Sequence, residues 1–115
     1  MRKICLMNYS VLSIPPFDKQ LKRLAKKYSS LKKEFSRLLE SLETKPKQGT
    51  ALGNNCYKIR LAIASKNKGK SGGARVITNF VIADYTVYLL TIYDKAEKEN
   101  LSDKELTELL KYVSP

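Results

Sequence analysis

The sequence predicts an α+β fold: an N-terminal strand, a helical hairpin packed on an antiparallel sheet of about four strands, and a short C-terminal helix. Three observations predict it: two successive amphipathic helical repeats, three later runs rich in β-branched and aromatic residues, and a helix-start signal near the C-terminus. With 115 residues, the chain can build one hydrophobic core but not two. We therefore expect residues 1–115 to form a single domain.

The first part of the chain is expected to form one strand and two helices. Residues 4–12 have the β-branched and aromatic bias of a strand, which the Pro15-Pro16 pair ends. Apolar side chains then recur with helical spacing over residues 17–28 and again over residues 31–42. The two helices form a hairpin, and their many basic residues are typical of the solvated face of any surface helix.

The second part of the chain is expected to form the rest of the sheet and the last helix. Residues 43–55 carry turn residues and are predicted to be a loop. Three strand-like runs follow, at residues 56–64, 75–83 and 86–93, and the last two form an antiparallel hairpin. Ser102 and Glu105 fit a capping box, which predicts a helix from residue 103 to about 112.

Positive charge is concentrated in residues 57–75. This stretch contains six basic residues, and no Asp or Glu occurs between Glu43 and Asp84. The formal net charge of the chain is +11. A face with so much uncompensated charge repels itself and is stabilised by a polyanion, of which nucleic acid is the first candidate.

Strand alternation selects the candidate site residues from this charge. Lys58 and Arg60 lie on one face of their strand, opposite the apolar face that the helices are expected to cover. Arg75 begins the next strand, and the basic face is expected to stay open. Tyr93 and Lys95 leave the last strand beside it, where a lysine among other cations is a candidate for proton transfer near neutral pH.

The loop over residues 67–73 has two interpretations. Gly69-Lys70-Ser71 does not make a P-loop, because Ala64 stands where that motif needs glycine and a strand follows. The loop is either a phosphate cradle, to which Lys68 and Lys70 supply charge, or a solvated turn. Both interpretations remain open from the residues alone.

Several function classes are excluded or disfavoured. The chain contains no histidine, so a zinc site and an acyl-transfer triad are not expected, and no cofactor is predicted. Its apolar runs are too short to cross a membrane, and the N-terminus does not resemble a signal peptide. We therefore expect a cytoplasmic protein with reduced cysteines.

Three segments together resemble the RelE/ParE toxin superfamily, in its HigB-like RelE branch: Y-K-I-R-L, G-K-S-G-G-A-R-V-I and L-L-T-I-Y-D-K-A-E-K-E-N-L-S. The resemblance covers roughly residues 10–112. It implies a bacterial type II toxin that cleaves mRNA on the ribosome without a metal, using the 2′-hydroxyl as nucleophile. It also implies a cognate antitoxin, expected to be a small helix-turn-helix protein.

The resemblance also implies roles for individual residues. Lys58 and Arg60 match the strand pair that grips the RNA backbone and is a candidate for the general base, and Arg75 matches the arginine that stabilises the phosphorane. Lys95 lies near the family's later catalytic basic residue. Where some members stack an aromatic ring on a base, this chain has Leu101, and Tyr93 is the candidate substitute. Further RNA-binding candidates are Lys66, Lys68, Lys70 and Lys98.

Two alternatives come from other function classes. The first is a ParE-like toxin that inhibits DNA gyrase by protein contact and is not an enzyme, because the fold alone does not separate the two activities. The second is a basic nucleic-acid-binding module without turnover. The basic set on the sheet favours the ribonuclease.

Overall fold

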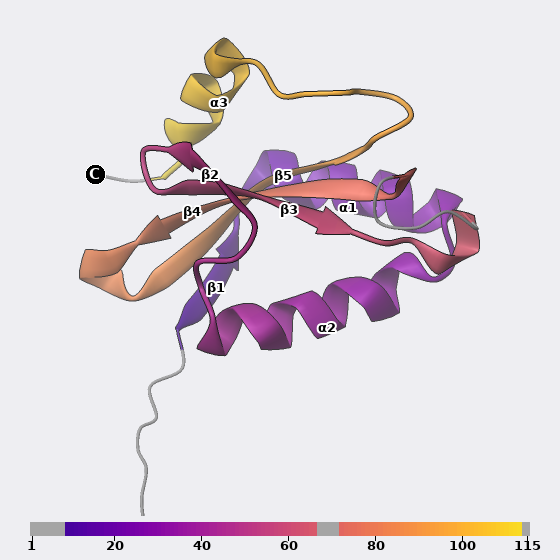
Figure 1. Ribbon diagram of the computed structural model, residues 1–115, viewed down its shortest axis with the longest axis horizontal. Coiled ribbons are helices and arrows are strands. Elements are labelled where there is room, and N and C mark those ends of the chain that lie inside the picture. The colour runs from indigo at the N-terminus through magenta and orange to yellow at the C-terminus, as the bar shows by residue number, and fades with distance from the viewer. Residues whose placement is uncertain (1–8, 67–71, 114–115) are drawn as a thin grey trace, which may run out of the picture.

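A computed structural model describes residues 9–66 and 72–113, and this part of the chain folds into a five-stranded sheet with three α-helices (Figure 1). The helices and strands in chain order are β1 (Ser10–Ser13), α1 (Pro15–Lys27), α2 (Leu31–Thr44), β2 (Thr50–Gly53), β3 (Cys56–Leu61), β4 (Ala74–Val81), β5 (Thr86–Asp94) and α3 (Asp103–Leu110). Two short 3-10 turns, η1 (Ala64–Lys66) and η3 (Ile82–Asp84), follow β3 and β4. The predicted α+β class is confirmed.

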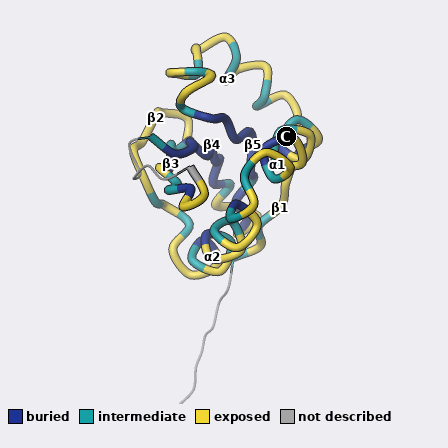
Figure 2. Tube along the Cα trace, turned by 90° about the vertical axis from the view of Figure 1, so that its right-hand side faces the viewer, coloured by how far each residue is buried: buried dark blue, intermediate teal, exposed yellow. Residues whose placement is uncertain are grey.

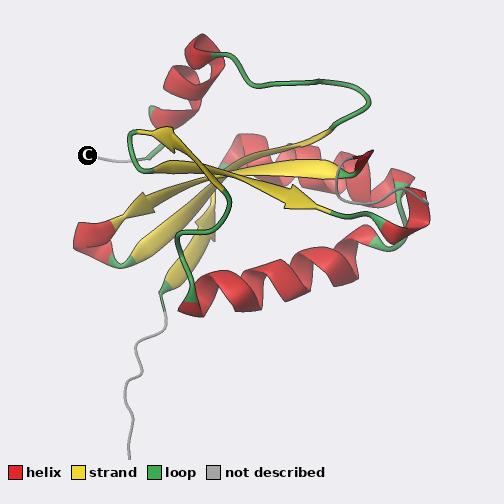
Figure 3. Ribbon diagram, in the orientation of Figure 1, coloured by secondary structure: helices red, strands yellow, loops and turns green. Residues whose placement is uncertain are grey.

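The sheet has the strand order β1-β5-β4-β3-β2. Figure 3 shows its strands in yellow and the helices in red. Neighbouring strands are antiparallel, except that β1 runs parallel to β5. The sheet is therefore mixed, whereas the sequence predicted an antiparallel one. Such a parallel edge strand requires a long crossover connection, which the helices and the three intervening strands supply.

The helices cover both sides of this sheet. Helices α2 and α3 lie on opposite sides of it, and α1 runs beside β5 (Figures 1 and 2). The helical hairpin buries Phe17, Leu24, Leu31 and Leu42 completely or nearly so, and the Phe17 and Phe35 rings pack at a centroid distance of 5.4 Å. The predicted helical spacing therefore identifies the residues that form the core.

The expected loop over residues 43–55 contains a strand that the sequence did not predict. Strand β2 pairs antiparallel with β3, and the turn between them places Asn54 and Asn55 at φ values of 53° and 60°. Asparagine tolerates this left-handed conformation, which tight β-hairpins need. All four β2 residues are exposed, so no apolar alternation marks the strand, and the sheet has five strands and not about four.

The ends of the chain agree with prediction where they are described. Strand β1 occupies residues 10–13, and the part of the predicted strand before residue 9 lies outside the described residues. Helix α3 begins with the predicted capping box: the Glu105 N–H donates to Ser102 Oγ at 3.1 Å, and Ser102 N–H donates to the Glu105 carboxylate at 2.9 Å. Within the described part of the chain, no helix is both long and apolar enough to cross a membrane.

Candidate nucleic-acid interface

Three candidate residues form one row across three strands. In the register of the sheet, Arg60 of β3 lies directly opposite Arg75 of β4, and Arg75 lies directly opposite Tyr93 of β5. Directly opposite residues share a face, with Cβ atoms about 4.5–5.5 Å apart. We call these three residues the arginine–tyrosine row. Two like charges placed side by side repel each other, and an anionic group between them would relieve that repulsion.

Two lysines flank this row along the strands. Lys58 precedes Arg60 by two residues, so it lies on the same face, and it is half-buried. At the other end, the Lys95 N–H donates to the Gly73 carbonyl at 3.0 Å, which extends the β4–β5 ladder by one residue beyond Asp94. Position 95 therefore shares the face of Tyr93. The backbone thus brings all five predicted catalytic candidates onto one region of the sheet.

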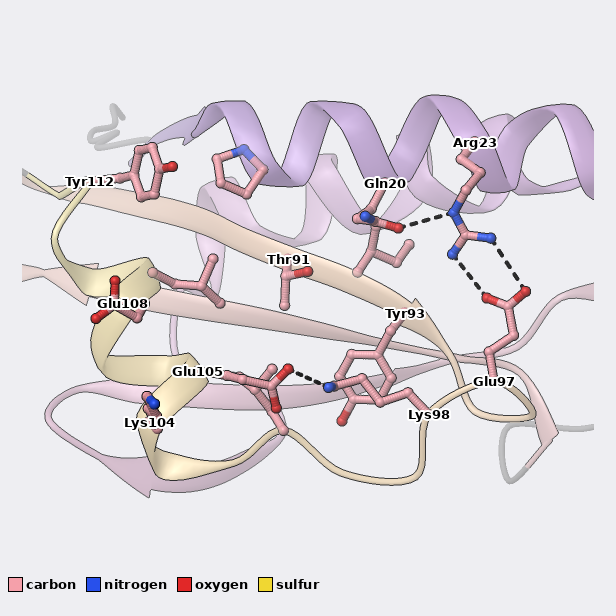
Figure 4. A pocket seen from close by; sticks show the side chains of 14 residues that line it. Gln20, Arg23, Thr91, Tyr93, Glu97, Lys98, Lys104, Glu105, Glu108 and Tyr112 are labelled. Carbon is pink, nitrogen blue, oxygen red and sulfur yellow. Dashed lines mark hydrogen bonds and ion pairs between the residues drawn. The ribbon is translucent and has the colours of Figure 1, made fainter.

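The expected open basic face is wrong for part of this region. Arg60 is exposed, but Arg75 is only 4% exposed and Tyr93 only 5%. Figure 4 shows the ion pair between Lys98 and Glu105 lying beside the Tyr93 ring. Strand alternation predicts helices only on the apolar face, whereas α3 lies on the other side of the sheet from α2 and covers the end of β5.

The environment of Tyr93 keeps its hydroxyl protonated. Burial raises the pKa of Tyr93, the Arg75 guanidinium partly opposes this shift, and the Glu105 carboxylate adds to it. The Tyr93 hydroxyl has no hydrogen-bond partner among the described residues. It is therefore neutral and a poor base near neutral pH, and because the oxygen itself is buried it is not open to a ligand in this conformation. Its burial also leaves the ring covered in this conformation, where the stacking role predicted for Tyr93 needs it accessible.

Two grooves border the row. One, of about 620 Å³, lies between α1, β5 and α3 and is lined by Gln20, Thr91, Tyr93 and Tyr112 among others (Figure 4). The other, of about 600 Å³, lies between α2 and β3, and both Lys58 and Arg60 line it. The second groove thus adjoins β3 at the positions of its two cationic residues.

Helix α2 contributes a cation whose position in the sequence predicts only a solvated surface. Arg37 lines the groove beside Lys58 and Arg60. Helical spacing places Arg37 opposite the apolar stripe, as it does many surface basic residues, so the pattern alone did not distinguish it. The nearby Glu34 carboxylate is engaged elsewhere, because it accepts the Ala64 N–H at 2.7 Å and the Ser30 hydroxyl at 3.1 Å.

The remaining RNA-binding candidates have different positions. Lys68 and Lys70 lie outside the described residues, and the backbone of Lys66 ends η1, which begins three residues after the end of β3. Lys98 forms its ion pair with Glu105. Among the residues described, no group of three or more His, Cys, Asp or Glu side chains could hold a metal ion.

Two carboxylates near the site make the stability of the protein sensitive to acid. Hydrogen bonds from Arg23 and then Lys27 lower the pKa of Glu97, and hydrogen bonds from Lys98 and the Ser102 backbone lower the pKa of Glu105. Because both folded pKa values lie below the ordinary value of 4.5, the stabilisation is complete above that pH and is lost as the pH falls through the folded pKa values.

We therefore expect the urea midpoint of unfolding to decrease as the pH is lowered from about 6 to about 3. The double variant Glu97→Gln, Glu105→Gln should show a smaller decrease, because it no longer gains protons at these positions. Equal pH dependence in the two proteins would contradict the assignment.

Comparison with known proteins identifies the family. The family model that describes the RelE toxin of the RelE/RelB toxin–antitoxin system matches residues 17–114. The chain belongs to the RelE toxin family. Its placement in the HigB-like branch stays a prediction.

Solved structures of RelE toxins have the same fold. A mutant of the E. coli toxin RelE in the free state is similar with a TM-score of 0.60 and 17% identity, over 94% of this chain and 100% of that chain. The intact E. coli RelBE toxin–antitoxin complex is similar with a TM-score of 0.59 and 18% identity, over 75% and 95% of the two chains. The RelBE2 toxin–antitoxin complex from Mycobacterium tuberculosis has a TM-score of 0.54 and 14% identity, over 80% and 97%.

Proposed function

We propose that this RelE-family toxin is a metal-independent endoribonuclease that cleaves mRNA on the ribosome. The observation that carries this proposal is the arginine–tyrosine row, in which Arg60 lies directly opposite Arg75 and Arg75 directly opposite Tyr93. Guanidinium groups bind phosphate through paired hydrogen bonds, and the half-buried Lys58 and Lys95 add charge on either side. The face is thus suited to a phosphodiester that becomes more negative during reaction.

The proposed reaction begins at the ribose of the substrate. The 2′-hydroxyl loses its proton to a base, and its oxygen attacks the adjacent phosphorus. The bond from phosphorus to the 5′-oxygen then breaks, and that oxygen takes up a proton. The products are a 2′,3′-cyclic phosphate and a 5′-hydroxyl. The chain has no histidine, so the proton transfers are assigned to the basic residues, with Lys58 or Arg60 and Lys95 as candidates.

Arg75 has the central role in this proposal. The trigonal-bipyramidal phosphorane carries extra negative charge, and a fixed cation aimed at that charge lowers the barrier without having to reorganise. Arg75 is 4% exposed and its Nη1 donates to the Ala74 carbonyl at 3.1 Å, so it is held rigidly and is little screened by water, and contact with a phosphate requires the groups that cover it to move. The neutral Tyr93 hydroxyl beside it is assigned as a hydrogen-bond donor to the same phosphate.

We also propose that a cognate antitoxin, expected to be a small helix-turn-helix protein, holds the toxin inactive. Two structures with a similar fold are toxin–antitoxin complexes, and the net charge of +11 suits a partner with an acidic surface. An action on ribosomes implies that the toxin works in the cytoplasm.

The proposal is tested with purified wild-type toxin and translating ribosomes. Primer extension is expected to map cuts within the translated part of the mRNA, and the cuts should be absent when ribosomes are omitted. Intact mRNA together with inhibition of gyrase-catalysed supercoiling would instead support the ParE-like alternative. RNA that is bound but not cut would support a binding module.

A further inference from the structure

The segment that carries Lys95 is attached to α1 by a buried carboxylate. Asp94 directly precedes Lys95 and is completely buried. Its carboxylate accepts the Tyr28 hydroxyl at 2.6 Å and the Ala96 N–H at 2.9 Å, and Lys27 Nζ lies 3.9 Å away. A buried charge is costly unless several groups bind it, so this position fixes the local backbone firmly.

A second carboxylate attaches the same segment to the same helix. Glu97 receives two hydrogen bonds from the Arg23 guanidinium, at 2.9 and 3.3 Å, and one from Lys27 at 3.2 Å (Figure 4 draws the Arg23 pair). The Glu97 and Lys98 N–H groups both donate to the Asp94 carbonyl at 3.0 Å. The turn after β5 is therefore held at its first and fourth residues. We call Arg23, Lys27, Tyr28, Asp94 and Glu97 the α1–β5 clamp.

Lys95 is held between these two attachments. Its N–H is bonded to Gly73, and the Asp94 side chain points to α1, so positions 93 and 95 share the opposite face. A lysine side chain has four rotatable bonds, so the direction of its ammonium depends on how firmly its backbone is fixed.

We infer that Asp94 and Glu97 are positioning residues that direct the Lys95 ammonium toward the arginine–tyrosine row. The inference rests on the proposed function and extends it to residues that do not touch the RNA. Asp94 is completely buried, whereas Arg23, Lys27 and Glu97 are exposed, and an apolar side chain of similar volume could fill the position of Asp94 without the cost of burying a carboxylate.

The test is a double-mutant cycle on mRNA cleavage by ribosome-bound toxin. Tyr28→Phe removes the hydroxyl that donates to Asp94 and keeps the aromatic ring. We expect this change to lower kcat roughly ten- to a hundredfold with little change in KM, because Lys95 is misplaced while RNA binding is retained. In a Lys95→Ala background, the same change should lower kcat no further, because the residue through which Tyr28 acts is absent.

Two further variants make the cycle decisive. Glu97→Gln loosens the second attachment and should give the same pattern, which keeps the test valid if Tyr28→Phe does not fold. Lys111→Gln is the matched control: it breaks the 2.9 Å ion pair between Lys111 and Glu108 at the end of α3 and should keep the wild-type kcat, because Lys111 does not line the groove beside Tyr93.

The outcomes separate the inference from the proposed function. Wild-type toxin that cuts no mRNA overturns both. If the wild type cuts mRNA, equal losses from Tyr28→Phe with and without Lys95 overturn the inference, because the clamp then acts independently of Lys95. Wild-type kcat in Lys95→Ala, or in both clamp variants, overturns it as well.

Discussion

Arg75→Met is expected to lower the rate of mRNA cleavage roughly 10²- to 10³-fold, because it removes the fixed cation from the developing phosphorane charge. Methionine is chosen because Arg75 is only 4% exposed, and a long apolar side chain fills the space that alanine would leave empty. Cleavage is measured by primer extension, and growth arrest is followed after induction of the toxin in cells.

Arg75→Lys distinguishes the contribution of the positive charge at position 75 from that of the shape of the guanidinium group. Lysine keeps the positive charge and loses the planar fork that binds phosphate through two hydrogen bonds, so we expect activity between those of wild type and Arg75→Met. Thermal unfolding and antitoxin binding, measured for both variants, establish that each is folded. A folded Arg75→Met protein that cleaves mRNA at the wild-type rate would refute the site.

Gly73→Ala is expected to damage both stability and activity. A Cβ atom at this position would lie 2.1 Å from the Leu61 carbonyl oxygen and 3.1 Å from the Ala62 Cα, and these backbone atoms belong to or adjoin β3. The strands must separate to relieve the clash, at a cost of about 1–3 kcal/mol or more. The separation also displaces Lys95, whose N–H binds the Gly73 carbonyl.

Gly53→Ala provides the comparison for this variant. A Cβ atom there meets nothing within 4 Å, although the φ of +92° makes alanine unfavourable by about 1 kcal/mol. Urea unfolding should therefore show some destabilisation in both variants, whereas only Gly73→Ala should lose cleavage. Wild-type stability and cleavage in Gly73→Ala would contradict the prediction, because they would show that β3 and β4 separate at this point without a measurable cost in stability.

Most secondary structure could be predicted from the sequence because it depends on local patterns. The apolar spacing of α1 and α2 identified side chains that are buried, and the Ser102–Glu105 capping box located the start of α3. Strand β2 could not be predicted in the same way. It is four exposed residues long and has no apolar alternation of its own, and its pairing with β3 depends on contacts between the two strands.

The candidate site was predictable in composition but not in geometry. Alternation placed Lys58 and Arg60 on one face, but the opposition of Arg60 and Arg75 depends on the register between β3 and β4, which a shift of one residue would change. The burial of Arg75 and the clamp on Asp94 depend on where helices pack in three dimensions. Neither the order of elements nor helical spacing specifies those contacts.

The ribosome makes β1 first and β5 last among the strands, yet these two strands are neighbours in the finished sheet. A growing chain that has not reached Thr86 has no partner for β1 and lacks both Tyr93 and Lys95. Contacts so distant in sequence form late, because the long loop between them must close first. The candidate site is therefore incomplete until β5 and Lys95 have been synthesised, so a shorter nascent chain carries only part of it.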